Sequence, residues 1–288
     1  MHYSDFITKA FDNIRKYPAL LLPETILFFA TYFLTIGLYR FSGLSAFAKT
    51  AMETGQKIDV STFIRDFAAG YSSQIIFSLA AFVIITFVMG AGTEAIKFRM
   101  IKKITDRMNV SIKDLFNGSW RDFFRIVGMK MIIYLIALVI FLCLMLAASF
   151  LLSLGNGFTS IGAWVAAGIG LAVFVILSIG LLFRYAILFM EEQNAATTVR
   201  WSFHYFKKHT NYVIILWLIY LGIGILFTIA SAIATMMFTS LRGNVDSAMA
   251  IYFVSFIGTV AAFAIRLVYN VWTGLFLFEA YSKNKIVR

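Results

Sequence analysis

The sequence predicts an all-α integral membrane protein that crosses the bilayer six times, with both termini in the cytoplasm. Three observations support this fold class. Hydrophobic residues make up 61% of the 288 residues and charged residues only 14%, whereas soluble domains are about half apolar and a quarter charged. Segment 131–183 contains no Asp, Glu, Lys or Arg, which is long enough for two spans of about 20 residues each. Lys and Arg also gather on one side of the predicted spans.

The apolar runs set the order of the elements along the chain. The predicted spans are 18–39, 72–96, 127–153, 161–190, 210–239 and 247–281. Gly155-Asn156-Gly157 provides the turn between the third and fourth spans. The external loop, 40–71, has apolar residues at helical spacing and is expected to form two short surface helices.

The basic residues predict the orientation, because cytoplasmic loops are enriched in Lys and Arg. One set of alternating segments, which includes both termini, carries 19 of the 25 Lys and Arg residues. Five lie on the opposite side: Arg40, Lys49, Lys57, Arg65 and Arg242. The remaining one, Arg266, falls within the last span. We therefore expect a multi-pass protein of the cell membrane with cytoplasmic termini. The formal charge of +11 is explained by the basic residues of the predicted cytoplasmic segments, so a nucleic-acid partner is not expected.

Short amphipathic segments, both basic and rich in aromatic residues, precede the first, third and fifth spans. In the second of them, Phe116, Trp120 and Phe123 share one helical face. Such helices should lie in the inner headgroup layer, with apolar faces toward hydrocarbon and cations toward anionic lipid. The predicted contacts with lipid headgroups or a protein partner are Lys9, Arg15, Lys16, Lys113, Trp120, Arg121, Arg125, Arg200, Trp201, Lys207 and Lys208. The alternative is that inner loops between spans are simply basic and aromatic.

The same elements recur three times. Each amphipathic segment is followed by two spans, and the second span ends in an acidic residue: Glu94, Glu191 or Glu279. We therefore expect a single transmembrane domain, 1–288, built of three repeats. Each repeat is an interfacial helix followed by a transmembrane hairpin. The approximate repeat boundaries are 1–110, 111–193 and 194–288.

Segment 191–208 carries a resemblance to a known family. Its sequence is Glu-Glu-Gln-Asn-Ala-Ala-Thr-Thr-Val-Arg-Trp-Ser-Phe-His-Tyr-Phe-Lys-Lys. It resembles the cytoplasmic linker of the membrane domain associated with glycerophosphoryl diester phosphodiesterases, and that domain's uncharacterised stand-alone prokaryotic relatives. The family linker has an Arg-Ser-Trp-like core, whereas the order here is Arg-Trp-Ser. The resemblance implies a prokaryotic plasma-membrane protein. Because no segment outside the spans is long enough for the soluble phosphodiesterase domain, that activity is not expected here.

Familiar catalytic and metal-binding motifs are absent from the sequence. The imidazoles are His2, His204 and His209, and they lack the Cys or carboxylate partners of a metal site. Neither a phosphate-binding glycine loop nor a Gly-x-Ser-x-Gly elbow occurs. We therefore expect no catalytic residue, cofactor or metal, with an intramembrane lipid enzyme as the remaining alternative. Cys143, in the third span, is expected to be buried and inert.

Polar residues within the spans are the most informative candidates. In the last span, one helical stripe contains Ser255, Thr259, Ala262, Arg266, Asn270 and Thr273. A charged Arg in hydrocarbon costs at least about 2.5–3.5 kcal/mol on insertion scales, so Arg266 should face protein, a water cavity or a lipid phosphate. Glu24 and Arg184 lie at similar predicted depths in the first and fourth spans and are expected to pair.

Two classes of function remain. The first is a non-catalytic, lipid-interacting scaffold or partner subunit. Its expected binding partners are anionic lipid headgroups, with a protein partner or a second copy of the chain as alternatives. The second is a transporter or channel for a small anionic or lipid-like substrate that uses the stripe around Arg266. The broken Gly/Pro spans typical of transporter sites are weak in this sequence, which favours the first class.

Overall fold

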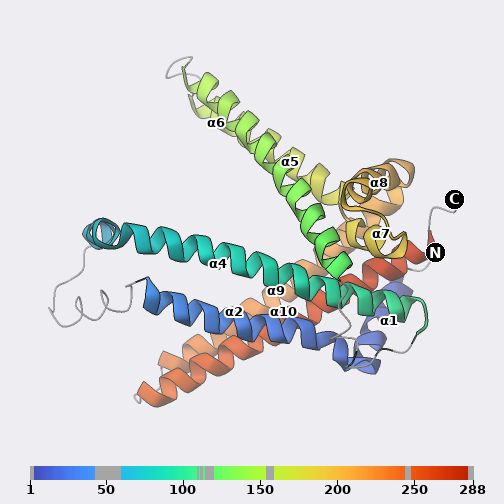
Figure 1. Ribbon diagram of the computed structural model, residues 1–288, viewed down its shortest axis with the longest axis horizontal. Coiled ribbons are helices and arrows are strands. Elements are labelled where there is room, and N and C mark those ends of the chain that lie inside the picture. Colours follow the sequence, from blue (N-terminus) through green and yellow to red (C-terminus); the bar gives the residue numbers. More distant parts are fainter. Residues whose placement is uncertain are drawn as a thin grey trace. The chain divides into compact units, whose positions relative to one another are not determined.

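The computed structural model describes residues 3–42, 60–108, 110, 113, 120–153, 159–243 and 248–284, and the regular elements in these ranges are all helices (Figure 1). Six stretches of this helical chain are long and apolar enough to cross a membrane, which confirms the predicted fold class at that level. The long helices are α2 (Leu22–Phe41), α4 (Val60–Thr105), α5 (Trp120–Ser153), α6 (Thr159–Gly180), α9 (Thr210–Gly243) and α10 (Ala248–Lys283). The short elements are α1 (Tyr3–Lys16), the 3-10 turn η1 (Pro18–Leu21), α7 (Arg184–Met190) and α8 (Ala195–Lys208).

The chain divides into two compact units. The first unit is Met1–Leu21 with Ala95–Arg288, and the second is Leu22–Glu94. The second unit therefore contains α2 and most of α4. Within it, the Phe41 and Phe77 rings lie 6.0 Å apart between their centroids.

One loop prediction differs from the structure, and two others lie outside the described residues. α4 begins at Val60, so the second predicted surface helix of the external loop is instead the start of a long helix. Segment 60–69 contains no glycine or proline to end that helix. The first predicted surface helix lies in 43–59, and the Gly155-Asn156-Gly157 turn lies in 154–158. Both of these segments are outside the described residues.

The second amphipathic segment is not a separate interfacial helix over its described part. Trp120 begins α5, which continues without a break into the third span. Most of residues 111–119 lie outside the described part of the chain. A run that is amphipathic at its start and apolar afterwards therefore forms one helix, because no proline or turn sequence separates the two parts.

The fourth predicted span is two helices. α6 ends at Gly180 and α7 begins at Arg184, with a tight turn between them. In that turn, the Leu182 amide donates to the Ile179 carbonyl and the Arg184 amide to the Leu181 carbonyl, each at 3.2 Å. A Cβ atom at Gly180 would collide with the Phe203 ring of α8. The break thus comes from close packing against a residue distant in sequence.

The two short amphipathic helices pack against protein with their apolar faces. On α1, Phe6, Ala10 and Ile14 are buried, and this helix lies along α10. On α8, Val199 and Tyr205 are buried. The expectation that these faces lie against hydrocarbon is therefore wrong. An amphipathic pattern predicts that one helix face is shielded from water. Here other helices of the first unit shield that face.

The first unit has its core at one end, which we call the basic end: α1, α7, α8 and the adjoining ends of α4, α5, α9 and α10. Phe98 of α4 stacks on Tyr185 of α7, with 4.2 Å between ring centroids. It also stacks on Phe278 of α10, at 5.7 Å. Away from this end the helices expose large apolar side chains, such as Trp164 at 79%. An apolar surface of this kind suits a lipid environment.

Candidate functional site

Cationic side chains surround a cavity of about 300 Å³ at the basic end, which we call the basic cavity. Its lining residues are Arg99, Lys102, Lys103, Met108, Arg121, Asp122, Arg125, Phe189 and Glu192. They come from the last turns of α4 and the turn after it, the first turns of α5, the end of α7 and the start of the linker that follows α7. Among these described residues five are cationic and two are acidic, a surplus of three positive charges.

Asp122 is the acidic residue that joins α4 to α5 in this cavity. It accepts a hydrogen bond from Arg99 Nε at 3.0 Å and forms an ion pair with the same guanidinium. It also accepts from Arg125 Nη1 at 3.1 Å. An acidic residue in the first turn of a helix is favoured by the helix dipole as well. Asp122 therefore balances two arginines from two helices.

Arg125 is held by backbone carbonyls as well as by Asp122. Its Nε donates to the Gln193 carbonyl at 2.8 Å, and its Nη2 donates to the Leu188 carbonyl. The Leu188 carbonyl is among the last four of α7, which no intrahelical donor satisfies. Arg125 thus fixes the end of α7 and the start of the following linker. Its predicted contact with lipid remains a prediction.

Glu192 closes the other side of the basic cavity. Lys102 Nζ lies 2.8 Å from Glu192 Oε1. The hydrogen bond from Lys102, together with its charge, lowers the pKa of the Glu192 carboxyl. Glu192 is therefore ionised at neutral pH, and the nearby charges of Arg121 and Arg125 lower its pKa further.

The linker helix α8 is anchored by polar contacts as well as by its apolar face. The Asn194 side chain caps its first turn by accepting from the Thr197 amide at 2.9 Å. Ser202 Oγ donates to the Gly180 carbonyl at 2.7 Å. Burial raises the pKa of the Tyr205 hydroxyl, so that group stays protonated. Burial also lowers the pKa of His209, with a smaller effect from the charge of Lys208, and this favours a neutral imidazole.

The other basic-end residues predicted from the sequence are spread over this surface. Lys9 Nζ forms an ion pair with the buried Glu279 carboxylate at 2.7 Å, which ties α1 to α10. Trp201 is partly exposed. Arg15, Lys16, Lys113, Trp120, Arg200, Lys207 and Lys208 are exposed. The structure therefore brings Arg121 and Arg125 together in the basic cavity and leaves most of the others on the outer surface.

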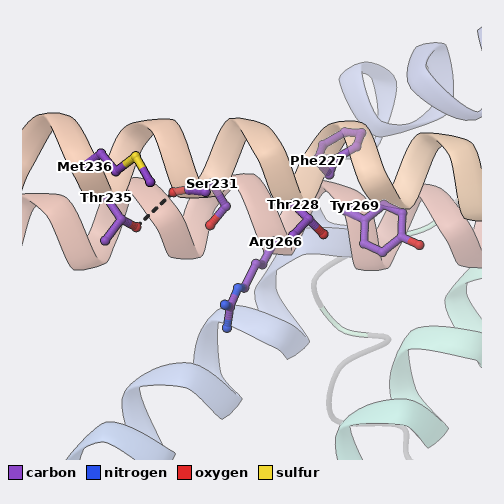
Figure 2. Close-up of a pocket in the computed structure, with 8 residues that line it drawn as sticks. Phe227, Thr228, Ser231, Thr235, Met236, Arg266 and Tyr269 are labelled. Atoms are coloured by element: carbon purple, nitrogen blue, oxygen red, sulfur yellow. Dashed lines mark hydrogen bonds between the residues drawn. The ribbon is translucent and has the colours of Figure 1, made fainter.

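A second cavity, of about 340 Å³, lies along α9 and α10, and we call it the Arg266 cavity (Figure 2). Its lining residues are Phe227, Thr228, Ser231, Ala232, Thr235, Met236, Arg266 and Tyr269. The three hydroxyl residues follow one another along α9 at intervals of three and four, so they share one face of that helix. Arg266 lines this cavity, and a cavity is one of the three surroundings that the sequence left open for it.

Two close helix contacts flank this cavity. A Cβ atom at Gly224 of α9 would lie 2.7 Å from Tyr269 Oη. A Cβ atom at Gly258 of α10 would lie 2.7 Å from Phe238 Cβ. Small residues allow such close approach between membrane helices. α9 and α10 are therefore held together on either side of a stretch lined by small hydroxyl side chains.

The predicted stripe of the last span is only partly realised at this cavity. Arg266 and Asn270 are both exposed, but only Arg266 lines the cavity. Thr273 Oγ1 donates to the Tyr269 carbonyl of its own helix at 2.8 Å. Apart from Tyr269 of α10, the residues that join Arg266 come from α9, and the sequence interpretation did not include them. The spacing of Gly224, Thr228, Ser231 and Thr235 was the signal that could have revealed them.

Two other predictions concern single residues in the spans. Arg184 Nη1 donates to the Leu181 carbonyl at 3.0 Å, and its guanidinium lies over the Tyr185 ring. Glu24 belongs to the second unit and Arg184 to the first, so their pairing remains a prediction. Cys143 is exposed rather than buried. That expectation was wrong because an apolar side chain in a span can face lipid as readily as protein.

Within the described ranges, no group of three or more His, Cys, Asp or Glu residues is arranged to hold a metal ion. No family model, curated protein or solved structure matches this chain. The resemblance of segment 191–208 to the phosphodiesterase-associated membrane domain therefore remains a prediction. The geometry of the two cavities carries the functional argument.

Proposed function

We propose that this protein is a non-catalytic, multi-pass module of the cell membrane that binds anionic lipid headgroups at its basic end. The basic cavity is the observation that carries this proposal. Its surplus of positive charge would attract a phosphate group, and cationic pockets of this kind at the cytoplasmic ends of membrane helices suit anionic headgroups. Its volume is at the lower limit of ordinary ligand pockets, about 300–1,000 Å³. That size fits a headgroup better than a larger cofactor.

The contacts within the cavity support a binding role rather than a catalytic one. Among the described residues of its lining there is no Ser, Thr, Cys or His, the side chains that most often act as nucleophile or general base. Its two carboxylates, Asp122 and Glu192, are engaged by cations. These pairs position the neighbouring arginines and lysines before a ligand arrives. Such preorganisation lowers the cost of binding.

The proposed orientation places the basic end and both termini in the cytoplasm. The segregation of Lys and Arg along the sequence supports it. We further propose three repeated hairpins. The short amphipathic helices α1 and α8, each directly before a span, support the first and third repeats. Exposed cations such as Arg15, Lys207 and Lys208 would meet the inner leaflet around the basic cavity.

The test is native mass spectrometry of the full chain released from nanodiscs that contain phosphatidylglycerol and phosphatidylcholine. We expect wild-type protein to retain phosphatidylglycerol preferentially. The double variant Lys103→Gln/Arg121→Gln should lose that preference. Arg40→Gln is the matched control, because Arg40 is an exposed cation in the last turn of α2 and does not line the basic cavity. Retention unaffected by the double variant would reject lipid binding here and assign the surface to a protein partner or a second copy.

The Arg266 cavity favours a second candidate, a transporter or channel for an anionic or lipid-like substrate. A cationic site near the middle of a span is unusual, and such sites mark substrate pathways in many membrane proteins. A liposome flux and lipid-scrambling assay of wild type and Arg266→Ala tests this candidate. Movement that the substitution abolishes would place transport first. Inactive vesicles with the anionic-lipid preference intact would leave the lipid-binding module as the function.

A further inference from the structure

The Arg266 guanidinium is a positive charge without a counter-charge on its own helix pair. α9 contains no carboxylate, and α10 contains only Glu279. Glu279 is thirteen residues from Arg266, or roughly 20 Å along a helix of 1.5 Å rise per residue. It is already paired with Lys9. Among the described residues, no ion pair, hydrogen bond or ring contact engages the Arg266 side chain.

Arg266 lies too deep in its span for its side chain to extend to the lipid headgroups. α10 extends over Ala248–Lys283, which puts Arg266 eighteen residues after its first residue and seventeen before its last. Long cationic side chains near helix ends reach the headgroup layer. From the middle of a span the distance to either layer is much longer than the side chain. A positive charge left at this depth is costly.

Ser231 is the second polar group without a partner at this site. Ser231 is 7% exposed and lines the cavity. Within the part of the chain that the structure describes, its hydroxyl makes no hydrogen bond. The hydroxyls of Thr228 and Thr235, in contrast, donate to carbonyls of their own helix at 2.8 and 2.9 Å. Ser231 is thus a largely buried residue at the cavity wall whose hydroxyl has an unused donor, and a ligand group or water in the cavity would satisfy it.

The rest of the lining is apolar. Phe227, Ala232 and Met236 lie beside the hydroxyl residues (Figure 2 labels Phe227 and Met236). A volume of about 340 Å³ holds a headgroup and a short length of hydrocarbon, but not a whole lipid. The chain of a longer ligand would have to continue along the apolar surface of α9, where Met237 and Ile233 are exposed.

We infer that the Arg266 cavity binds the anionic head of an acyl amphiphile within the membrane. The head is a carboxylate or a phosphate, both of which accept charge-assisted hydrogen bonds from a guanidinium. Arg266 is the cationic ligand, Ser231 donates a hydrogen bond, and Phe227 and Met236 contact the first methylene groups. This inference concerns the same site as the second candidate function and rests on that proposal only for the choice of site. A ligand can bind there whether or not the protein transports it across the membrane. It is independent of the basic cavity.

The experiment measures binding of three probes to the full chain in phosphatidylcholine nanodiscs: a 16-carbon fatty acid, lysophosphatidic acid and lysophosphatidylcholine. We expect the two anionic probes to bind and the zwitterionic probe not to bind. Inorganic phosphate and acetate should not compete, because they lack the acyl chain. The relative affinities of fatty acid and lysophosphatidic acid identify the preferred head, carboxylate or phosphate.

Variants assign the contacts. Arg266→Gln should weaken binding by about tenfold or more, as expected for the loss of a charge-assisted hydrogen bond. Ser231→Ala should weaken it by about fivefold, as expected for a neutral one. Thr259→Val is the matched control, since Thr259 is an exposed hydroxyl residue of α10 outside the cavity. Thermal unfolding of each variant verifies that it is folded.

Unchanged affinity in Arg266→Gln, or binding of lysophosphatidylcholine as tight as that of the anionic probes, would overturn the inference. If Arg266→Gln does not fold, Ser231→Ala decides, and unchanged affinity there overturns it. The retention of phosphatidylglycerol at the basic cavity is measured on the same variants. Loss of probe binding with that retention intact assigns the effect to the Arg266 cavity. Probe binding without flux upholds the site and rejects transport.

Discussion

Replacing Asp122 with asparagine tests whether ion pairs hold α4 and α5 together at the basic end. The Asp122 carboxylate balances Arg99 and Arg125, and the substitution keeps the shape of the side chain while it removes the charge. The side chains of Asp122, Arg99 and Arg125 are 13%, 21% and 12% exposed. Two largely buried guanidinium groups would thus lose their nearest carboxylate.

The expected magnitude follows from this burial. Breaking a fully buried ion pair costs about 3–5 kcal/mol. The value is smaller here because Arg99 retains some exposure and Arg125 keeps the Leu188 and Gln193 carbonyls. We therefore expect Asp122→Asn to lower the free energy of unfolding by about 2–3 kcal/mol, since solvent screens part of the interaction.

The assay is reversible denaturant unfolding of the full chain in detergent micelles, followed by circular dichroism. Asp12→Asn is the control, because Asp12 is an exposed carboxylate on α1. It should change the free energy of unfolding by less than about 0.5 kcal/mol, as surface substitutions usually do. Equal effects of Asp122→Asn and Asp12→Asn would refute the structural role of Asp122.

Two further predictions concern helix packing and pH. Gly258→Ala should lower stability by about 1–3 kcal/mol, because the new Cβ would lie 2.7 Å from Phe238 Cβ and overpack the contact. Gly222→Ala, where a Cβ meets nothing within 4 Å, should leave stability nearly unchanged, and a loss as large as that of Gly258→Ala would contradict the packing argument. Because the pKa of Glu192 is lowered in the folded protein, its contact with Lys102 stabilises above the unfolded-state pKa of 4.5 and is lost as pH falls through the folded-state value. Stability of wild type relative to Glu192→Gln should therefore decline slightly on acidification below about pH 5, and a constant difference would contradict this.

The order of helices was predictable because membrane spans are apolar for their whole length. The break at Gly180 was not, since it depends on the Phe203 ring of α8, which the local sequence does not report. The docking of α1 was missed for a related reason. Phe6 and Ile14 mark a covered face, but periodicity does not distinguish cover by protein from cover by lipid.

The candidate sites were predictable to different degrees. Arg266 was found because a charge in an apolar run is costly wherever it lies. Ser231, which lines the same cavity, was missed because a hydroxyl in a span ordinarily bonds to a carbonyl of its own helix. The pairing of Asp122 with Arg99 joins residues 23 positions apart. Charge patterns along the sequence place both residues near the same membrane surface but do not assign the partner.

The central claim is that the basic cavity selects anionic headgroups. Its most direct measurement is electron spin resonance of spin-labelled phosphatidylglycerol and phosphatidylcholine with the reconstituted full chain, which gives their relative association constant. The account predicts a ratio above one for wild type, which falls with added salt because charge is screened. The ratio should approach one in Lys103→Gln/Arg121→Gln and stay at the wild-type value in Arg40→Gln. A wild-type ratio of one, or a preference that the double variant retains, would contradict the claim.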